Sequence, residues 1–307
     1  MTHSSTNNKR NSLIELYRFL FALNVVIGHG LFPVDIEYFG PDRASVEFFF
    51  VLSGFLFCKS LDKYEEMSLL PAVKEMLISK IKPILIPTII GIVCNIILNY
   101  ITKYNPFKVF RYLWYIPAML AAFLLYTILR VLIKNEKKFW IIVGTICLIA
   151  TLLRFSGNET LFFFDFIRSA IAVSLGMLVA RIPKFEVKRK IVWWIALVPV
   201  AFAIFYIVFY KLATVAWFGG FMGIEAILNL ILYPALVYIT FNIDFHFSIF
   251  NYLGALSFGI YAFQCPARLI DAIGVPSRWI PFALIFVLAI GEDAIKRIIK
   301  HFRNKKV

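Results

Sequence analysis

The sequence has few charged residues for its length, and this shortage already excludes one class of protein. Only 16% of the 307 residues are Asp, Glu, Lys or Arg, against about 25% in an ordinary soluble domain. Hydrophobic residues make up 61%, more than a single soluble domain of this length can bury. A soluble enzyme is therefore excluded. A bundle of membrane helices is the alternative, and roughly ten spans of about 20 residues would use up the chain.

Cysteine motifs, a cleavable leader and internal repeats are also missing. The four cysteines are far apart and form no CxxC pair: Cys58, Cys94, Cys147 and Cys265. This spacing supports neither a metal cluster nor a disulfide framework, so no metal site is predicted. The polar N-terminal segment 1–12 leads into an apolar run without a small-residue cleavage site, which argues against a cleaved signal peptide. No repeat relates the two halves of the chain.

Apolar runs divided by interfacial breaks predict ten membrane spans in a single domain, 1–307. The predicted spans are 13–32, 44–60, 83–102, 112–132, 138–153, 161–180, 190–210, 217–240, 250–270 and 279–299. Segment 62–82 mixes Lys and Glu with apolar residues, so it is expected to form an amphipathic helix on the membrane surface. The predicted fold class is thus an all-α polytopic membrane protein.

Positive charge concentrates in alternate connections between these spans. With a cytoplasmic N-terminus, about two thirds of the 32 Lys and Arg residues fall on the inner side, including those of the basic tail 300–307. The positive-inside rule then places both termini in the cytoplasm. Because topology accounts for the net charge of +14, the expected partner is the lipid bilayer, and no nucleic-acid partner is predicted.

The first span carries three ionisable residues, which inside a membrane are functional candidates. Arg18 and His29 are eleven residues apart. At 100° per residue they point the same way, about 16 Å apart along the axis. Ala22 and Val25 lie between them and are small enough to leave a groove open. In the alternative reading, Arg18 pairs with Glu15 and extends toward the inner interface, while His29 extends toward the outer one.

The second span begins near the outer side with Glu47. This carboxylate is expected at the level of His29, where it would fix the imidazole tautomer and raise its basicity for general-base work. Gly54, on nearly the same face, would let another helix approach closely. Two plainer readings stay open: Glu47 as a carboxylate in water at a loop edge, and Ser53 as a hydrogen-bond donor to its own helix backbone.

Arg18, His29 and the run VEFFFVLSGFLF at 46–57 closely resemble the opening of the membrane-bound acyltransferase-3 family. Three weaker similarities follow in order. They are the basic stretch that ends at Pro83, the pair Trp114 and Tyr115, and a late L-G-x-x-S pattern over 253–266. The chain departs from the family at Gln264, where histidine is frequent, so no proton transfer is assigned there. It also has Lys80 and Lys82 where arginines are more common.

Members of this family move an acyl group, commonly acetyl from acetyl-CoA, onto a hydroxyl of a cell-surface or exported glycan or a related acceptor. The resemblance therefore implies a multi-pass O-acetyltransferase of a bacterial-type cell membrane, with acyl-CoA as donor substrate and no permanently bound cofactor. His29 and Glu47 are the catalytic candidates, through direct transfer or an acyl-histidine intermediate. The candidates for binding the donor are Arg18, Ser53, Lys80 and Lys82.

The candidates for binding the acceptor are Trp114, Tyr115, Arg168 and Tyr261. The aromatic residues could stack on sugar rings, although an aromatic belt at the membrane interface explains them equally well. Arg168 could hold the acceptor together with Asp165, or the two could simply pair with each other. The rival function is a transporter or flippase of glycan intermediates or small molecules, in which the same charged residues line a substrate path. The acyl chain, the acceptor and the oligomeric state stay open.

Overall fold

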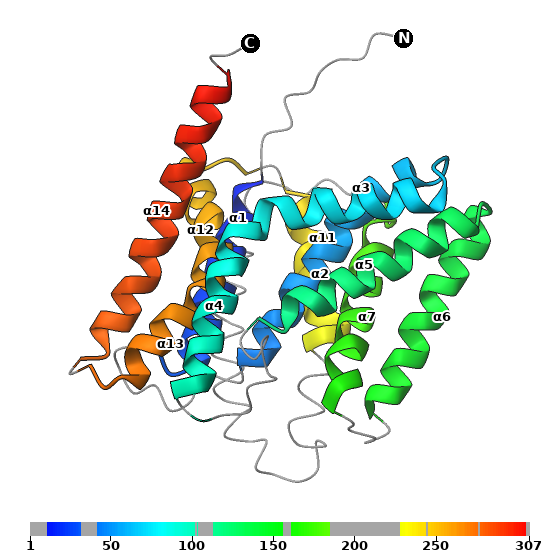
Figure 1. Ribbon diagram of the computed structural model, residues 1–307. Coiled ribbons are helices and arrows are strands. Elements are labelled where there is room, and N and C mark those ends of the chain that lie inside the picture. The colour runs from blue at the N-terminus through cyan, green and yellow to red at the C-terminus, as the bar shows by residue number, and fades with distance from the viewer. Residues whose placement is uncertain are drawn as a thin grey trace.

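The computed structural model describes residues 11–31, 42–101, 103, 113–155, 161–184, 228–243, 245–275 and 277–304. Every regular element in these residues is a helix, and no strand occurs among them (Figure 1). The all-α prediction is therefore confirmed for this part of the chain. The predicted span 190–210 and the first part of the span 217–240 lie outside the described residues.

The described helices coincide with the predicted apolar runs, with one exception near the C-terminus. In chain order they are α1 (Ser12–Gly28), α2 (Asp42–Leu61), η1 (Asp62–Tyr64), α3 (Leu69–Ile81), η2 (Lys82–Ile84), α4 (Leu85–Ile101), α5 (Tyr115–Leu132), α6 (Glu136–Phe155), α7 (Leu161–Val179), η4 (Leu228–Leu232), α11 (Tyr233–Phe241), α12 (Ser248–Ala262), α13 (Gln264–Ala272) and α14 (Trp279–Asn304). The exception is the predicted span 250–270, which is two helices that meet at Phe263. Pro266 explains the break, because it has no N–H for the carbonyl of Ala262 and its ring crowds that carbonyl.

Two helical stretches, Leu69–Ile101 and Tyr115–Leu132, are long and apolar enough to cross a membrane, and Leu228–Phe241 is a shorter apolar helix. Within the first stretch, α3 lies across one end of the bundle and α4 turns away to run along it (Figure 1). Helix α1 begins and α14 ends at the end of the bundle that carries α3. The count of ten spans and their orientation stay predictions.

Large apolar side chains point outward from the bundle on several helices. On α4 and α6 the most exposed include Ile86, Ile89, Ile141, Leu148 and Leu152. A soluble protein rarely leaves so much contiguous apolar surface in water, whereas hydrocarbon accommodates it. These faces support the prediction that the bundle is embedded in lipid.

Helix α1 lies between α2 and α12, and three polar or aromatic contacts fix how it meets them. Phe21 stacks on Phe48 of α2 with ring centroids 4.1 Å apart, and Asn24 donates a hydrogen bond to Ser45. Each step forward along α1 is therefore matched by a step backward along α2, so the two helices are antiparallel. At the start of α1, the Ser12 hydroxyl donates to Asn251 of α12 over 3.0 Å.

Helices α2 and α7 approach each other through a glycine on each side. A Cβ at Gly54 would lie 2.8 Å from Cα of Val173 and closer still to its carbonyl oxygen. A Cβ at Gly176 would lie 2.8 Å from the backbone nitrogen of Phe55 and closer to the carbonyl of Val51. The prediction that Gly54 admits a neighbouring helix is confirmed, and α7 is that helix.

Candidate functional site

Glu47 lies deeper in the bundle than the sequence predicted. The antiparallel register of α1 and α2 sets Phe48 against Phe21 and Ser45 against Asn24, so Glu47 is level with Ala22. His29 is seven residues farther along α1, about 10 Å at 1.5 Å per residue. The expected position of Glu47 beside His29 is therefore wrong. The reason is that α2 already begins at Asp42, more than a turn before Glu47.

Glu47 instead forms a buried ion pair with Arg168 of α7. The two side chains are 1% and 2% exposed, which removes the reading of Glu47 as a carboxylate in water. The guanidinium of Arg168 also lies over the Trp114 ring, 4.8 Å from its centroid, and 3.8 Å from Asp165. Mutual attraction and the aromatic face offset the cost of removing both charges from water. Arg168 and Trp114 are thus engaged with each other inside the bundle.

His29 is instead oriented by a glutamine. It follows the last residue of α1 as its C-cap, and its Nδ1 hydrogen-bonds with Oε1 of Gln264, the first residue of α13. Gln264 is 0% exposed. An amide oxygen only accepts, so this contact places the proton on Nδ1 and the lone pair on Nε2. The sequence left Gln264 without a role, and the structure makes it the group that selects the His29 tautomer.

Ser53, Tyr115 and Tyr261 form a second polar group from α2, α5 and α12. The Ser53 and Tyr115 hydroxyls are 3.0 Å apart, and the Tyr115 and Tyr261 rings meet edge to face at 5.7 Å. Tyr115 also donates to the carbonyl of Phe49 over 3.5 Å. The Ser53 side chain therefore has a partner on another helix. The structure brings together one predicted donor-binding residue and two predicted acceptor-binding residues.

Arg18 belongs to the same level of the bundle. It pairs with Glu15 over 2.8 Å, as the alternative reading expected. The register of α1 and α2 sets Arg18 opposite Val51, two residues before Ser53. Glu15 is held by close packing of α1 on α12, where a Cβ at Gly254 would lie 2.7 Å from Cα of Glu15.

The face of α1 between Arg18 and His29 is filled. Ala22 and Val25 are 0% and 1% exposed, and Ala22 packs in an apolar cluster that also contains Ile260 and Phe263. The open groove expected along these small residues is therefore wrong. Small side chains here let α12 and α13 pack closely instead of leaving space.

Two lysines lie over stacked phenylalanine pairs near the end of the bundle that carries α3. Lys59 Nζ is 4.8 and 4.6 Å from the Phe55 and Phe241 ring centroids, and these rings stack at 4.3 Å. Lys80 Nζ is 5.5 and 5.4 Å from those of Phe57 and Phe123, which stack at 4.4 Å. We call these two arrangements the lysine–phenylalanine units. Lys82, in contrast, is exposed on η2.

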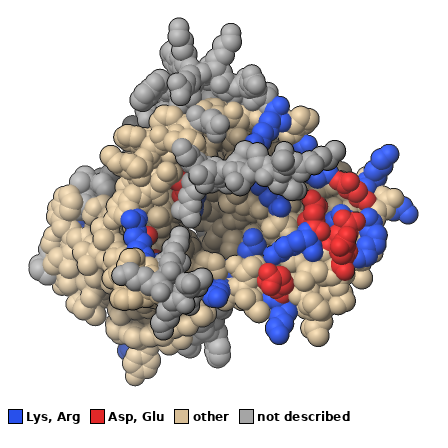
Figure 2. Space-filling view, turned by 90° about the horizontal axis from the view of Figure 1, so that it is seen from above, with Lys and Arg blue, Asp and Glu red and all other residues tan. Residues whose placement is uncertain are grey.

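The face of the bundle that carries α3 is hollowed, with Lys and Arg side chains around the hollow (Figure 2). The sequence identified Lys80 but not Lys59. The signal for Lys59 was its position four residues after Phe55, which places both on one helix face. Ammonium groups are attracted to aromatic faces, so both lysines are held in place before any ligand arrives.

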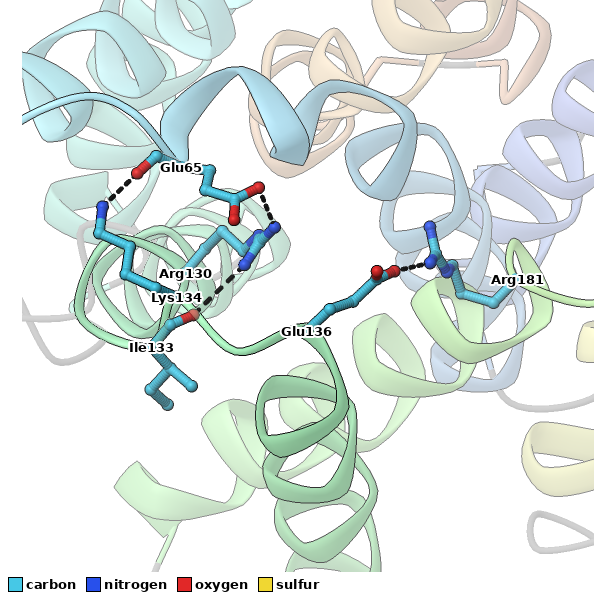
Figure 3. Close-up of polar contacts among 6 residues, drawn as sticks. All are labelled: Glu65, Arg130, Ile133, Lys134, Glu136 and Arg181. Carbon is cyan, nitrogen blue, oxygen red and sulfur yellow. Dashed lines mark hydrogen bonds and ion pairs between the residues drawn. The ribbon is translucent and has the colours of Figure 1, made fainter.

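A polar network fastens the segment from η1 to α3 onto the bundle (Figure 3). Arg130 of α5 binds the Glu65 carboxylate and donates to the carbonyl of Ile133 over 3.2 Å, while Lys134 donates to the Glu65 carbonyl. A separate pair, formed by Arg181 after α7 and Glu136 at the start of α6, joins those two helices. The contacts of Glu65 hold the part of the chain that leads into α3, which carries Lys80.

Lys63 of η1 adds a further positive charge beside this network. It donates to Glu75 of α3 over 3.3 Å. Burial lowers the pKa of Lys63, but hydrogen bonds to Tyr64 and Glu75 outweigh this effect and raise the pKa above its ordinary value. The ammonium therefore stays charged at neutral pH.

The described residues show no metal site, and the groove between α5, α6 and α7 is separate from these clusters. No group of three His, Cys, Asp or Glu residues that could hold a metal occurs among them. An apolar groove of about 330 Å³ lies between α5, α6 and α7 and is lined by Leu125, Ile149, Leu153 and Phe166 among others. The groove shares no lining residue with the clusters described above.

Comparison with known families assigns the chain to one of them. A family model for the acyltransferase domain of type 3 matches residues 11–291, a range that includes every cluster described above. Comparison with curated proteins gives no match, and comparison with solved structures gives none. The match covers far more than half of the 307 residues and agrees with the motifs of the first two helices. The chain belongs to the membrane acyltransferase-3 family, and it is an acyltransferase of that family.

Proposed function

We propose that the protein is an integral-membrane O-acyltransferase that moves an acyl group, in the simplest case acetyl, from cytoplasmic acyl-CoA to a hydroxyl of an extracytoplasmic glycan. The observation that carries this proposal is a ladder of polar groups along the bundle. Donor and acceptor are on opposite sides of a membrane in this scheme, so the acyl group needs a polar path through the protein.

The register of α1 and α2 gives the ladder its length. Arg18 is level with Val51, and Lys59 is eight residues nearer the end that carries α3, which is about 12 Å. His29 is eleven residues in the other direction, about 16 Å. Between these ends lies the polar group that contains Tyr115. The total of about 28 Å is close to the 30 Å thickness of a bilayer hydrocarbon core.

The lysine–phenylalanine units are the proposed docking site for the CoA phosphates. Lys59 and Lys80 lie at the basic end of the ladder, and lysine binds phosphate as a point charge. Arg18 then supplies the next positive charge toward the centre. The amides of the pantetheine arm would find hydroxyl partners at Ser53 and Tyr115. Lys82 is exposed and would attract the negatively charged donor toward the site more than it would bind the donor's phosphates.

At the far end of the ladder, His29 is the proposed general base. Its Nε2 takes the proton from the acceptor hydroxyl as that oxygen attacks the thioester carbonyl. The tetrahedral intermediate then expels the CoA thiolate, which recovers the proton from the imidazolium. Gln264 holds the Nδ1 proton throughout and keeps Nε2 directed at the acceptor. An acyl-histidine route, in which Nε2 attacks the thioester first, uses the same residues.

The test supplies membranes that contain the protein with labelled acetyl-CoA and candidate glycans. Label on the glycan, together with an equal amount of released CoA, is expected for the wild type. His29→Ala is expected to abolish both while the protein remains folded in the membrane, as checked by its thermal unfolding. Full activity of His29→Ala would remove the mechanism. Uptake of a glycan into vesicles without acylation would support the rival transporter.

A further inference from the structure

The corner of the structure that contains His29 also holds a cationic residue, Arg268. Gln264 and Arg268 are four residues apart on α13 and therefore share one face of that helix. Gln264 contacts the His29 imidazole. The Nη2 atom of Arg268 lies 3.9 Å from the point that a Cβ of Gly30 would occupy. One face of α13 thus carries both Gln264, the partner of His29, and the guanidinium of Arg268, which lies next to Gly30.

Gly30 allows the turn that brings the end of α1 to this corner. Its φ is +68°, a left-handed conformation that side-chain-bearing residues adopt at a cost. A Cβ there would be 3.9 Å from Nη2 of Arg268, which is ordinary van der Waals contact, so the backbone conformation and not a lack of space favours glycine. The turn after α1 therefore positions His29 and Arg268 around one exposed corner.

Arg268 differs from Arg168, the arginine that the sequence favoured for the acceptor. Arg168 is closed off by Glu47 and is 2% exposed. The Arg268 side chain is 27% exposed, and its contact with Asp271 of the same helix is 3.5 Å, longer than the 2.7–2.9 Å of a strong charge-assisted bond. Surface pairs of this kind contribute little and exchange readily. An incoming anion can therefore reach the guanidinium from outside the bundle.

We propose that Arg268 binds an oxyanion of the acceptor, carboxylate or phosphate, and so makes this enzyme selective for acidic glycans. The proposal rests on the proposed function, because it takes His29 as the base that acts on the acceptor hydroxyl. A guanidinium forms two parallel hydrogen bonds to a carboxylate or phosphate. Such a contact orients a sugar whose reacting hydroxyl is at Nε2 of His29 and whose anionic group is close by.

The test compares matched acceptors that differ in charge. The wild type, in phosphatidylcholine nanodiscs, is supplied with acetyl-CoA and either a uronic-acid oligosaccharide, its carboxyl-reduced counterpart or a phosphorylated oligosaccharide. A preference of roughly tenfold to a hundredfold in kcat/KM is expected for the charged acceptors, as one hydrogen-bonded charge contact gives. Arg268→Gln is expected to reduce this ratio to near one, and Arg268→Lys to retain part of it.

The matched control is Arg278→Gln, which removes an exposed arginine ahead of α14 and is expected to keep the charge preference. An equal loss for charged and neutral acceptors in Arg268→Gln would overturn the proposal, because it would assign Arg268 to the thioester oxyanion. An unchanged ratio would overturn it as well. A rate that follows added phosphatidylglycerol instead of the glycan's charge would assign the anion to a lipid headgroup and overturn it too.

Binding measured without acyl-CoA separates this proposal from the proposed function. Charge-selective oligosaccharide binding that Arg268→Gln abolishes, in a protein that never acylates any glycan, would support the anion site and contradict the acyltransfer. Acylation without charge selectivity would support the acyltransfer and contradict the anion site.

Discussion

Replacing Gly176 by alanine is expected to separate α2 from α7. The new Cβ would be 2.8 Å from the backbone nitrogen of Phe55 and nearer still to the carbonyl oxygen of Val51. Both obstructing atoms belong to the backbone of α2, so no side chain can rotate away. To reach ordinary van der Waals contact, the two helices have to move apart.

The cost follows from two opposing effects. Overpacking a core typically costs about 1–3 kcal/mol, and the upper end applies because backbone has to shift. Alanine recovers roughly 1 kcal/mol of helix propensity relative to glycine. The net loss is therefore about 2 kcal/mol in the free energy of unfolding. The separation also strains the pair of Glu47 and Arg168, which joins the same two helices, so the loss does not fall below this figure.

Gly144→Ala is the matched control for this substitution. Gly144 lies in α6, and a Cβ there meets nothing within 4 Å. This variant keeps the propensity gain without the clash, so we expect it to be as stable as the wild type or about 1 kcal/mol more stable. Reversible denaturation in mixed detergent micelles measures both. If Gly176→Ala is as stable as Gly144→Ala, the close contact of α2 with α7 is refuted.

Three further predictions concern the clusters. Gln264→Leu should lower kcat by about tenfold to a hundredfold with little change in KM, since it removes the group that selects the His29 tautomer. Gln264→Glu should restore much of the rate, and equal damage by both variants would indicate a packing role. Lys80→Met should raise the KM for acyl-CoA several-fold, and the same change at exposed Lys82 should alter this KM little. Steady-state kinetics at varied acyl-CoA concentration measures both values, and equal effects would contradict the docking site. Glu47→Gln should destabilise the protein by about 3–5 kcal/mol because Arg168 is left charged and buried. In a double-mutant cycle measured by denaturation, adding Arg168→Met removes both charges and should recover part of this loss. Purely additive losses would refute the coupling of the two residues.

The helices could be predicted from the sequence because each is coded locally. An apolar run of about 20 residues is visible without any partner, and the described helices lie where those runs predicted them. The break at Phe263 was missed because Gly254 and Tyr261 continue the apolar run on one side of it and Ala267 on the other. Only the backbone chemistry of Pro266 marks the boundary.

The site could be predicted only in part because its contacts join distant segments. Hydropathy places Glu47 at the start of a span but does not state which residue of α1 is opposite. That register depends on how Phe21 stacks on Phe48. His29 and Gln264 are 235 residues apart in sequence, so spacing along one helix could not reveal their contact. The same limit hid Lys59, whose second ring comes from Phe241.

Sidedness of the reaction is the measurement that tests the central claim most directly. Proteoliposomes would carry glycan acceptor in one compartment and labelled acetyl-CoA in the other, with CoA release followed on the donor side. If the polar ladder passes the acyl group through the bundle to His29, enclosed glycan becomes labelled while the CoA stays outside. Labelling only when both substrates share a compartment would contradict that account.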